Sequence, residues 1–430
     1  MASEWSSVRL AGLCDPERDI TYGIVKVGDF VVDGVPVIRG GDIREGRIVF
    51  DEEKRVNIEV SQQFRRTILK GGEILINLIA EPGHTAIVPQ ELAGANVSRD
   101  VAVIALNDEI DHKYVNYCLK SSMAVNWLKA RLQGSVTQKI NLATLRDLPI
   151  PTPSRTEQHF IVRALGTLDD KIELNRKMNE TLEAMARALF KSWFADFDPV
   201  RAKAEGRNPS LPASIAALFP DSFQDSELGE IPAGWSVLGL DETARFLNGL
   251  ALQKFPPKGD RFLPVIKISQ LRAGDVTGAD KASADLAPDY VVEDGDVLFS
   301  WSGSLECVLW SGGRGALNQH LFKVTSEEFP KWFYFLWIHQ HLDDFRQIAA
   351  GKATTMGHIQ RHHLSAAKVV VPPALLLKEM SRHLAPLIDQ IVQFKCESKA
   401  LAAARDLLLP KLISGELRLD VVESNAGECA

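Results

Sequence analysis

The sequence lacks the features that mark several classes of protein. Its 430 residues include only five cysteines, Cys14, Cys118, Cys307, Cys396 and Cys429, and none of them forms a C-x-x-C pair. This scarcity excludes a zinc ribbon and argues against a disulfide framework, so we expect a cytoplasmic protein. The longest apolar runs are far shorter than the ~20 residues of a membrane span. The first residues also lack the basic and apolar parts of a signal peptide, so we expect no association with a membrane.

An excess of positive charge is also missing. The formal net charge is −7, from 49 Lys and Arg against 56 Asp and Glu. Proteins that bind nucleic acid by bulk electrostatics are basic, so any affinity for DNA must come from local groups or from partner subunits. The hydrophobic fraction of 45% and the charged fraction of 24% are ordinary for a globular protein. The length predicts two to four domains, each large enough to bury a core.

Signatures of catalysis are absent as well. The sequence contains no G-x-x-x-x-G-K-[ST] phosphate loop, G-x-G-x-x-G turn, G-x-S-x-G elbow, H-E-x-x-H pair or Asn/Asp-Pro-Pro-Tyr/Phe tetrapeptide. Arg361-His362-His363 with His358 resembles a metal cluster, but its basic, glycine-flanked setting favours solvated or phosphate-contacting histidines. The Asp169-Asp170 pair lies in a helical segment and is most simply a solvated face. The chain is therefore predicted to be non-catalytic and to hold no metal.

What the sequence does contain is a repeat about 220 residues long. WSSVRL at 5–10 returns as WSVLGL at 235–240, VPVIR at 35–39 as LPVIK at 263–267, and GGEILI at 71–76 as DGDVLF at 294–299. Solenoid repeats are only about 20–50 residues long, so this period indicates a duplicated domain. Duplication followed by divergence suits a protein that reads two different targets with one geometry.

Each copy combines short strands with a helix and ends at prolines. The first copy, 1–153, has β-branched runs separated by glycine turns, which predict strands at 20–27, 35–38, 47–50, 73–78, 84–88 and 101–106. A helix is expected over 114–132. The second copy, 235–373, predicts strands at 265–268, 296–301 and 321–324 and a helix at 332–348. Prolines at 149–153 and 372–373 break the pattern. A connector, 201–234, has one short helix expected near 215–218.

A helical segment with a heptad seam follows each copy, at 154–200 and 374–412. Apolar residues at steps of three and four form the two seams: Leu165, Leu168, Ile172, Leu182 and Leu189, then Leu384, Leu387, Ile391, Leu401 and Leu408. Each residue of the second seam lies 219 positions after its counterpart. Asn175 and Asn179 interrupt the first seam. They either face solvent where the seam frays or are buried and fix its register.

The order of the parts along the chain constrains how the helices pair. The first helix leads from one copy to the other, so a second helix that shares its seam must run back, antiparallel, with a pseudo-twofold axis between the copies. A helix over 157–194 would be roughly 55 Å long, enough to hold two domains in major grooves about 34 Å apart. The tail, 413–430, should close against the first domain, because SGEL at 414–417 echoes LGEI at 228–231.

Two loops in matching places are candidate nucleic-acid contacts. GSVTQK at 134–139 and GKATTM at 351–356 offer hydroxyl, amide and lysine groups, which bond to phosphates and base edges. A capped solvent loop is the alternative. Basic and polar residues near 39–47 and 267–272, and a serine-rich turn after the strand at 296–301, add further candidates. The predicted DNA contacts are Arg39, Arg44, Arg47, Ser135, Thr137, Gln138, Lys139, Lys267, Ser269, Gln270, Arg272, Ser300, Ser302, Lys352, Thr354 and Thr355.

The order of parts resembles the specificity subunit of type I restriction–modification systems. FADFDPVRA at 194–202, GEIPAGW at 229–235 and LPKLISGEL at 409–417 are similar to stretches common in that family. The resemblance implies an α+β fold in which two similar target-recognition domains are joined by two long antiparallel coiled-coil helices. It also implies a non-catalytic subunit that recognises a bipartite, asymmetric site in double-stranded DNA.

The resemblance further implies partners and the location of the cofactors. Two methyltransferase subunits would dock on the helices, and restriction and translocase subunits would join through them. S-adenosylmethionine would bind the methyltransferase, and ATP and magnesium the motor, with no cofactor on this chain. A protein-interaction scaffold with duplicated α+β modules is the alternative, but it would not need paired polar loops that differ. A fused restriction enzyme would need the methyltransferase and nuclease motifs that the sequence lacks.

Overall fold

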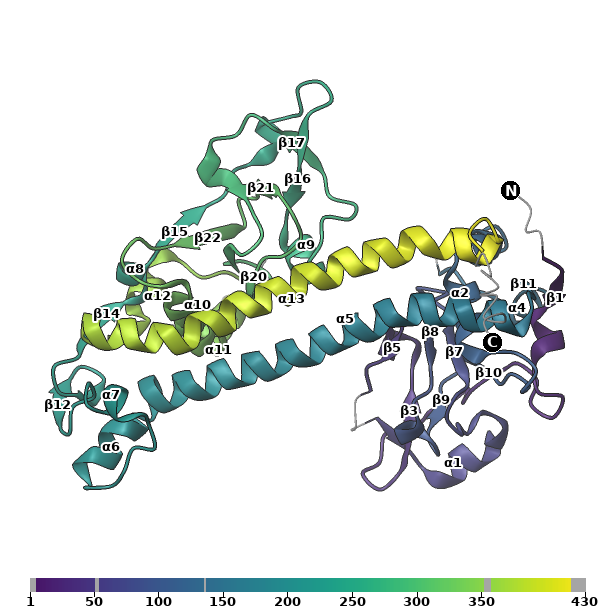
Figure 1. Ribbon diagram of the computed structural model, residues 1–430, viewed down its shortest axis with the longest axis horizontal. Helices are drawn as coiled ribbons and strands as arrows, with labels where there is room; N and C mark the ends of the chain where they lie inside the picture. The colour runs from purple at the N-terminus through teal and green to yellow at the C-terminus, as the bar shows by residue number, and fades with distance from the viewer. Residues whose placement is uncertain (1–4, 51–53, 135–136, 352–356, 419–430) are drawn as a thin grey trace, which may run out of the picture. The chain divides into compact units, whose positions relative to one another are not determined.

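The computed structural model describes residues 5–50, 54–134, 137–351 and 357–418. It divides into two compact α+β units, Met1–Asp170 with Leu401–Ala430, and Lys171–Ala400 (Figure 1). The long helices α5 (Arg155–Phe190) and α13 (Ala374–Ser414) each contribute residues to both units. Each unit therefore consists of one α+β domain together with part of each helix.

The first unit is built on a four-stranded antiparallel sheet. Its order is β2 (Thr21–Tyr22), β10 (Val101–Ile104), β7 (Ile74–Asn77), β8 (Thr85–Ile87). A second sheet, in the order β6 (Arg55–Val56), β3 (Val35–Ile38), β9 (Asn96–Val97), contains the parallel pair β3–β9. Smaller elements are β4 (Ile43–Arg44), β5 (Arg47–Ile48), η1 (Leu10–Leu13), η2 (Gly40–Asp42), α1 (Ile58–Gln63), η3 (Arg65–Thr67), η4 (Gln90–Leu92) and α4 (Leu142–Arg146).

Two local predictions for the first unit need correction. The expected helix over 114–132 is two helices, α2 (His112–Lys120) and α3 (Ser122–Lys129), because the Ser121 hydroxyl accepts a hydrogen bond from the Ala124 N–H and starts a new helix. The proline segment forms a strand, β11 (Pro149–Pro151), which pairs with β1 (Ser7–Arg9). Proline is tolerated there because a strand in a two-stranded sheet needs only one hydrogen-bonded edge.

The second unit repeats the four-stranded sheet and the parallel strand pair of the first, and its second sheet has one strand more. Its four-stranded sheet has the order β15 (Arg245–Asn248), β22 (Leu321–Thr325), β19 (Val297–Ser300), β20 (Cys307–Leu309). The second sheet has the order β17 (Lys281–Ser283), β16 (Phe262–Ile266), β21 (Gly315–Leu317), β18 (Val291–Val292), with β16 and β21 parallel. β14 (Ser236–Gly239) pairs with β23 (Lys368–Val371), as β1 does with β11. The predicted duplication is therefore confirmed.

The remaining elements of the second unit surround these sheets. They are α6 (Asp198–Ala204), α7 (Ala213–Ala216), β12 (Phe223–Ser226), β13 (Gly229–Pro232), α8 (Leu240–Thr243), η6 (Leu252–Lys254), α9 (Ile268–Ala273), η7 (Pro288–Tyr290), α10 (Lys331–Gln340), α11 (Leu342–Ala350) and α12 (Arg361–Ala366). The helix expected over 332–348 is thus α10 and α11. In the part of the chain that the structure describes, no helix combines the length and hydropathy needed to cross a lipid bilayer.

An aromatic cluster holds the end of α5 in the second unit. Here α5 continues into one π-helical turn, η5 (Lys191–Ala195). Phe194 in this turn is buried, with ring centroids 5.9 Å from Trp332 and 5.8 Å from Phe333. Phe190 packs edge-on against Trp337 at 5.1 Å. Aromatic pairs contribute about 0.5–1.5 kcal/mol beyond the area they bury, so this end of the helix is strongly fixed to its domain.

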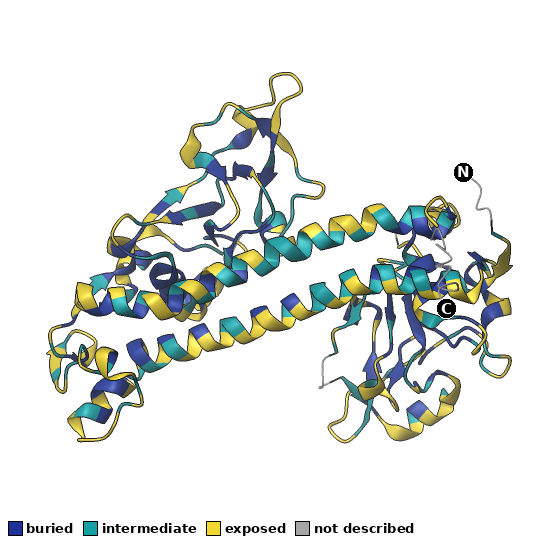
Figure 2. Cartoon of the chain, in the orientation of Figure 1, coloured by how far each residue is buried: buried dark blue, intermediate teal, exposed yellow. Residues whose placement is uncertain are grey.

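The two long helices pair antiparallel within each unit. In the first unit, Asp169 of α5 forms an ion pair with Arg405 of α13 at 2.8 Å. In the second, the Asn175 amide donates to Glu397 at 2.8 Å, and Glu183 lies 3.3 Å from Lys395. Residues further along α5 contact residues earlier in α13, so the two helices run antiparallel. All ten predicted seam residues are buried or half-buried, and Figure 2 shows buried and exposed positions alternating along both helices.

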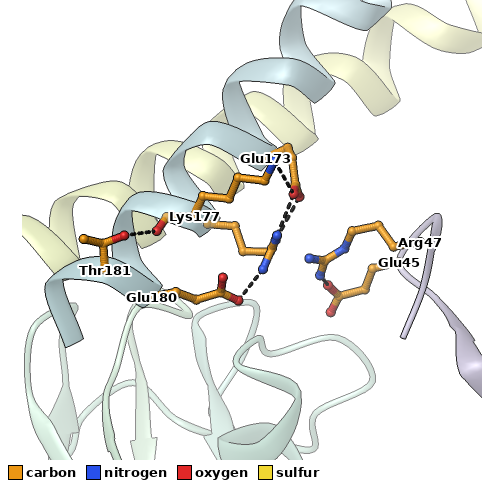
Figure 3. A network of polar contacts seen from close by, with 7 residues as sticks. Glu45, Arg47, Glu173, Lys177, Glu180 and Thr181 are labelled. Carbon is orange, nitrogen blue, oxygen red and sulfur yellow. Dashed lines mark hydrogen bonds and ion pairs between the residues drawn. The ribbon is translucent and has the colours of Figure 1, made fainter. Parts of the chain in front are cut away.

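The outer face of α5 is charged, as a heptad helix requires. Arg176 pairs with Glu173 at 2.6 Å and with Glu180, and Lys177 lies 3.8 Å from Glu173 (Figure 3). Exposed pairs of this kind contribute only about 0–1 kcal/mol each. Their arrangement therefore shows which face is solvated rather than what holds the helix.

Asp169 does not belong to this solvated face, contrary to the prediction. Its carboxylate is half-buried, accepts a hydrogen bond from the Tyr117 hydroxyl at 2.6 Å and pairs with Arg405. Burial, with this hydrogen bond second, raises the pKa of Tyr117 well above its ordinary value. Asp170 alone is exposed. Asp169 therefore joins the first domain to both helices.

Each domain has a further attachment within its unit. Lys399 of α13 donates to the carbonyls of Gly274 and Ser311 and lies 5.7 Å from the centre of the Trp310 ring. In the first unit, Arg418 lies over the ring of Trp5 at 5.8 Å. The described end of the chain therefore lies beside its described start.

Asn175 and Asn179 are buried in the seam, which decides between the two interpretations of these residues. Asn175 is fully buried and Asn179 is 8% exposed. The side-chain oxygens of both have no hydrogen-bond partner among the described residues. Only Asn175 has a bonded amide, through Glu397. Such residues lower stability but fix the register of paired helices.

We expect Asn179→Leu to raise the free energy of unfolding by about 1 kcal/mol, because it removes a buried acceptor that has no partner. Asn175→Leu is the matched control, and it should gain less because it also breaks the bond to Glu397. Urea denaturation followed by circular dichroism measures both. Equal gains for the two variants would show that the Glu397 bond contributes nothing.

Candidate nucleic-acid interface

In the first unit, three chain segments meet at one end of the four-stranded sheet. The segment after β7 lies between the other two: the Leu78 N–H donates to the Asp100 carbonyl at 2.7 Å, and the Ile140 N–H donates to the Leu78 carbonyl at 2.9 Å. The Ala80 N–H donates to the Gln138 carbonyl at 3.1 Å. We call residues 77–80, 98–100 and 138–140 the first edge. It contains the end of the loop predicted from the sequence.

The second unit has the same three-segment arrangement. The Trp301 N–H donates to the His320 carbonyl at 3.4 Å, and the Ile359 N–H donates to the Trp301 carbonyl at 3.0 Å. The Gly303 N–H donates to the Gly357 carbonyl at 2.9 Å. We call residues 300–303, 318–320 and 357–359 the second edge. These three backbone bonds correspond to the three of the first edge, so the duplication produces two sites with the same core arrangement.

A glycine packs against the residue that leads into the turn at 98–100 of the first edge, and another packs against the turn at 318–320 of the second. A Cβ atom on Gly23 would lie 1.8 Å from the Val97 carbonyl oxygen, and one on Gly249 would lie 2.2 Å from that of Asn318. No other residue fits at such a distance without moving the backbone. The two turns are therefore held in one position by close packing before any ligand arrives.

The side chains of the two edges differ in character. Gln138 and Lys139 on the first edge are exposed. On the second, the Trp301 ring packs against His320 at 5.9 Å and His358 at 6.3 Å. The Trp301 indole N–H donates to Asn248 Oδ1 at 3.0 Å. One edge thus presents long flexible groups, while the other presents imidazoles held around an indole.

The structure brings some of the predicted contacts to these edges. Gln138 and Lys139 are part of the first edge, and Thr137, which directly precedes them, is also exposed. Arg39 and Lys267 also lie next to the edges, because the preceding residues, Ile38 and Ile266, accept backbone bonds from Ser98 and Asn318 at 2.9 and 3.3 Å. Four predicted contacts lie outside the described residues: Ser135, Lys352, Thr354 and Thr355.

Ser300 and Ser302 are not on the surface, so their predicted placement in an exposed loop is wrong. Ser300 is 0% exposed and Ser302 is 4% exposed. The Ser300 hydroxyl donates to the Ser304 carbonyl at 2.6 Å, and that of Ser302 bonds His320 Nδ1 at 3.1 Å. Both hydroxyls stabilise the turn after β19. The alternation of strand side chains continues past the strand and turns these residues inward.

Most of the other predicted cations already have partners. Arg47 pairs with Glu45 at 2.9 Å (Figure 3), and Arg44 Nε donates to the Gly41 carbonyl at 2.6 Å. In the second unit Lys267 pairs with Asp280, Arg272 with Glu306 at 3.6 Å, and Ser269 donates to Gln270. Partly exposed ion pairs are weak, so these side chains can exchange an acidic partner for a phosphate.

The sequence interpretation missed three edge residues, Arg99, Gln319 and His320. Arg99 and Gln319 lie 220 positions apart in the turns of the two copies, so the repeat itself carried the signal. Among the described residues, no group of three or more metal-binding side chains was found. The His362 and His363 rings lie with their centroids 3.9 Å apart and their planes tilted by 48°.

Comparison with known proteins agrees with this architecture. The model of the type I restriction modification DNA specificity domain matches residues 2–184. The type I restriction enzyme MjaIX specificity subunit of Methanocaldococcus jannaschii is 25% identical over 406 residues, which cover 92% of this chain and 89% of that protein. The chain is therefore similar to the specificity subunits of type I restriction–modification systems.

Other specificity subunits are similar to this chain along nearly its full length. The HindI specificity subunit of Haemophilus influenzae is 23% identical over 477 residues, covering 96% of this chain and all of that protein. The crystal structure of the S subunit of a type I system from M. genitalium has the same fold, with a TM-score of 0.53 and 16% identity over 95% of this chain and 96% of that one.

Proposed function

We propose that this chain is a specificity subunit that recognises a bipartite, asymmetric DNA site, one half with each edge, and holds two methyltransferase subunits on its paired helices. The observation that carries the proposal is the pair of edges, which share the three backbone bonds that join their segments and differ in their side chains. Identical halves would read a symmetric site with identical residues. Two edges of one geometry and different chemistry suit two different half-sites.

The partners account for what this chain does not supply. Its net charge of −7 gives little attraction to DNA as a whole, so the methyltransferase subunits would neutralise much of the phosphate backbone. S-adenosylmethionine would bind to them, and ATP and magnesium would bind to the restriction and translocase subunits that join through them. This chain would contribute sequence recognition and spacing, and no catalytic group.

A scaffold that binds only protein is the competing function. This competing function predicts that substitutions of the edge side chains leave the DNA sequence preference of the complex unchanged. The exposed Gln138 and Lys139, with Arg39 beside them, favour the DNA-reading proposal, because amide and cationic groups bond to base edges and phosphates.

A domain exchange tests the proposal. The chain is purified together with the methyltransferase subunit of its system, and methylated sites are mapped on random DNA. We expect one bipartite motif, and exchanging residues 1–153 for those of another family member should change one half only. The exchange must include β11, because β1 pairs with it.

The controls separate the two functions. The chain alone should transfer no methyl group, and the exchanged chain should elute with the methyltransferase at the same volume as the unchanged chain. Assembly without any sequence preference would favour the scaffold. A change in both half-sites after the exchange would contradict the assignment of one half to each domain.

A further inference from the structure

The turn at residues 98–100 of the first edge and the turn at 318–320 of the second present one side chain from the same backbone position. In the first unit this is Arg99, whose N–H donates to the Ile24 carbonyl at 3.0 Å; in the second it is Gln319, whose N–H donates to the Leu250 carbonyl at 3.0 Å. We propose that Arg99 and Gln319 are equivalent specificity residues, each reading one base pair of its half-site in the major groove. The inference rests on the proposed DNA-reading function and adds the residues that perform it.

Hydrogen bonds hold the backbone of the first turn, whereas the guanidinium of Arg99 has no partner among the described residues. Asp100 accepts hydrogen bonds from the Gly40 N–H at 2.9 Å and from the Ser98 hydroxyl, so its carboxylate braces the turn. The Arg99 side chain is exposed, and no described residue forms an ion pair or hydrogen bond with its guanidinium. A planar fork of N–H donors on a fixed turn matches the O6 and N7 acceptors of guanine.

The second turn is braced by other groups and presents an amide. The Gln319 carbonyl accepts the Trp301 indole N–H at 3.2 Å, which fixes the backbone. The Gln319 amide nitrogen lies 3.3 Å from His320 Nε2, and His320 Nδ1 bonds the Ser302 hydroxyl. The amide therefore donates one hydrogen to the imidazole, which leaves its second N–H and its carbonyl oxygen. No described residue bonds to that oxygen.

One donor and one acceptor side by side are what adenine requires. Glutamine bonds bidentately to adenine N6 and N7, and arginine bonds to guanine O6 and N7. The difference between the two turns is thus the substitution that changes the preferred base while the backbone stays the same. Asp100 and His320, which follow, serve as braces in both cases. The Arg99 side chain is exposed and the Gln319 side chain is half-buried, and a purely structural role would not leave the guanidinium and the amide oxygen without partners among the described residues.

Reciprocal substitution tests the inference in the complex with the methyltransferase subunit. Arg99→Gln should lower discrimination at one position of one half-site by about 5–150-fold, the equivalent of 1–3 kcal/mol, and move the preference from guanine toward adenine. Gln319→Arg should do the reverse in the other half-site. Arg99→Lys should keep overall affinity and lose discrimination, because a point charge lacks the planar fork. Methylation-site mapping and competition binding measure these effects.

Arg9→Gln is the matched control, because Arg9 is an exposed arginine on β1, which belongs to neither edge. It should leave the motif unchanged, and all variants should assemble with the methyltransferase as the unsubstituted chain does. An unsubstituted complex without sequence preference would refute the proposed function itself. A clear bipartite motif that Arg99→Gln and Arg99→Lys leave intact, or weaken evenly at all positions, would refute only the base-reading role and make Arg99 a phosphate contact.

Discussion

Ile391→Asp is expected to destabilise the protein by about 3–5 kcal/mol, because it places an unpaired carboxylate in the seam. Ile391 of α13 is fully buried within the largest apolar cluster of the second unit, next to Leu384 and Ile388. Its counterpart in the first seam, Ile172, is only half-buried. Ile172→Asp should therefore cost clearly less, although the two residues occupy equivalent heptad positions.

Gln393→Asp is the control for charge on the same helix, because Gln393 is exposed two residues further on. A surface change of this kind stays within about 0.5 kcal/mol. Urea denaturation measures all three variants, and size-exclusion chromatography with the methyltransferase subunit reports assembly. An Ile391→Asp variant as stable as Gln393→Asp would mean that the helices do not pack through this seam.

Lengthening both helices together should change the DNA spacer. Inserting seven residues after Asp170 and seven after Ala400 keeps the heptad phase and adds about 10 Å, or about three base pairs. These positions are chosen because they lie between the two units. They leave the Asp169–Arg405 pair in the first unit and the Lys399 contacts with Gly274 and Ser311 in the second. We expect methylation of a site with a longer unread spacer.

Inserting four residues into α5 alone is the opposing control. It should abolish assembly, because it shifts the seam of one helix against the other. The added spacing of the double insertion can be smaller than three base pairs, since the domains must also follow the turn of the groove. An active double-insertion complex that still requires the original spacer would show that the helices join the domains without measuring the DNA.

The long-range regularities of this chain could be predicted from the sequence because they repeat. The heptad steps predicted both helices, and the common offset of 219 residues predicted that they share one seam. The strands at 35–38, 74–77 and 101–104 lie within the predicted runs, because β-branched residues bounded by glycine favour strands wherever they occur. These features depend on neighbours a few residues away and need no tertiary information.

The chemistry of the edges depended on contacts between distant segments. The neighbouring glycine suggested that Ser300 and Ser302 are exposed. They are buried, because the segments around 320 and 359 form backbone hydrogen bonds with Trp301 and pack over both serines. Asp169 looked solvated on its helix, but Tyr117 lies against it from 52 residues away. The repeat pairs Arg99 with Gln319, but the sequence alone does not show that Arg99 lies in a turn held by hydrogen bonds.

By itself, the sequence determined that this protein is a duplicated α+β chain with two antiparallel heptad helices and no catalytic motif, since periodicity and composition are local properties. Only the tertiary structure decided which polar side chains lie at the two edges, which are buried, and that Asn175 and Asn179 lie inside the seam. The physical reason is that exposure of a polar group is set by whichever segment packs over it. Here that segment comes from elsewhere in the chain.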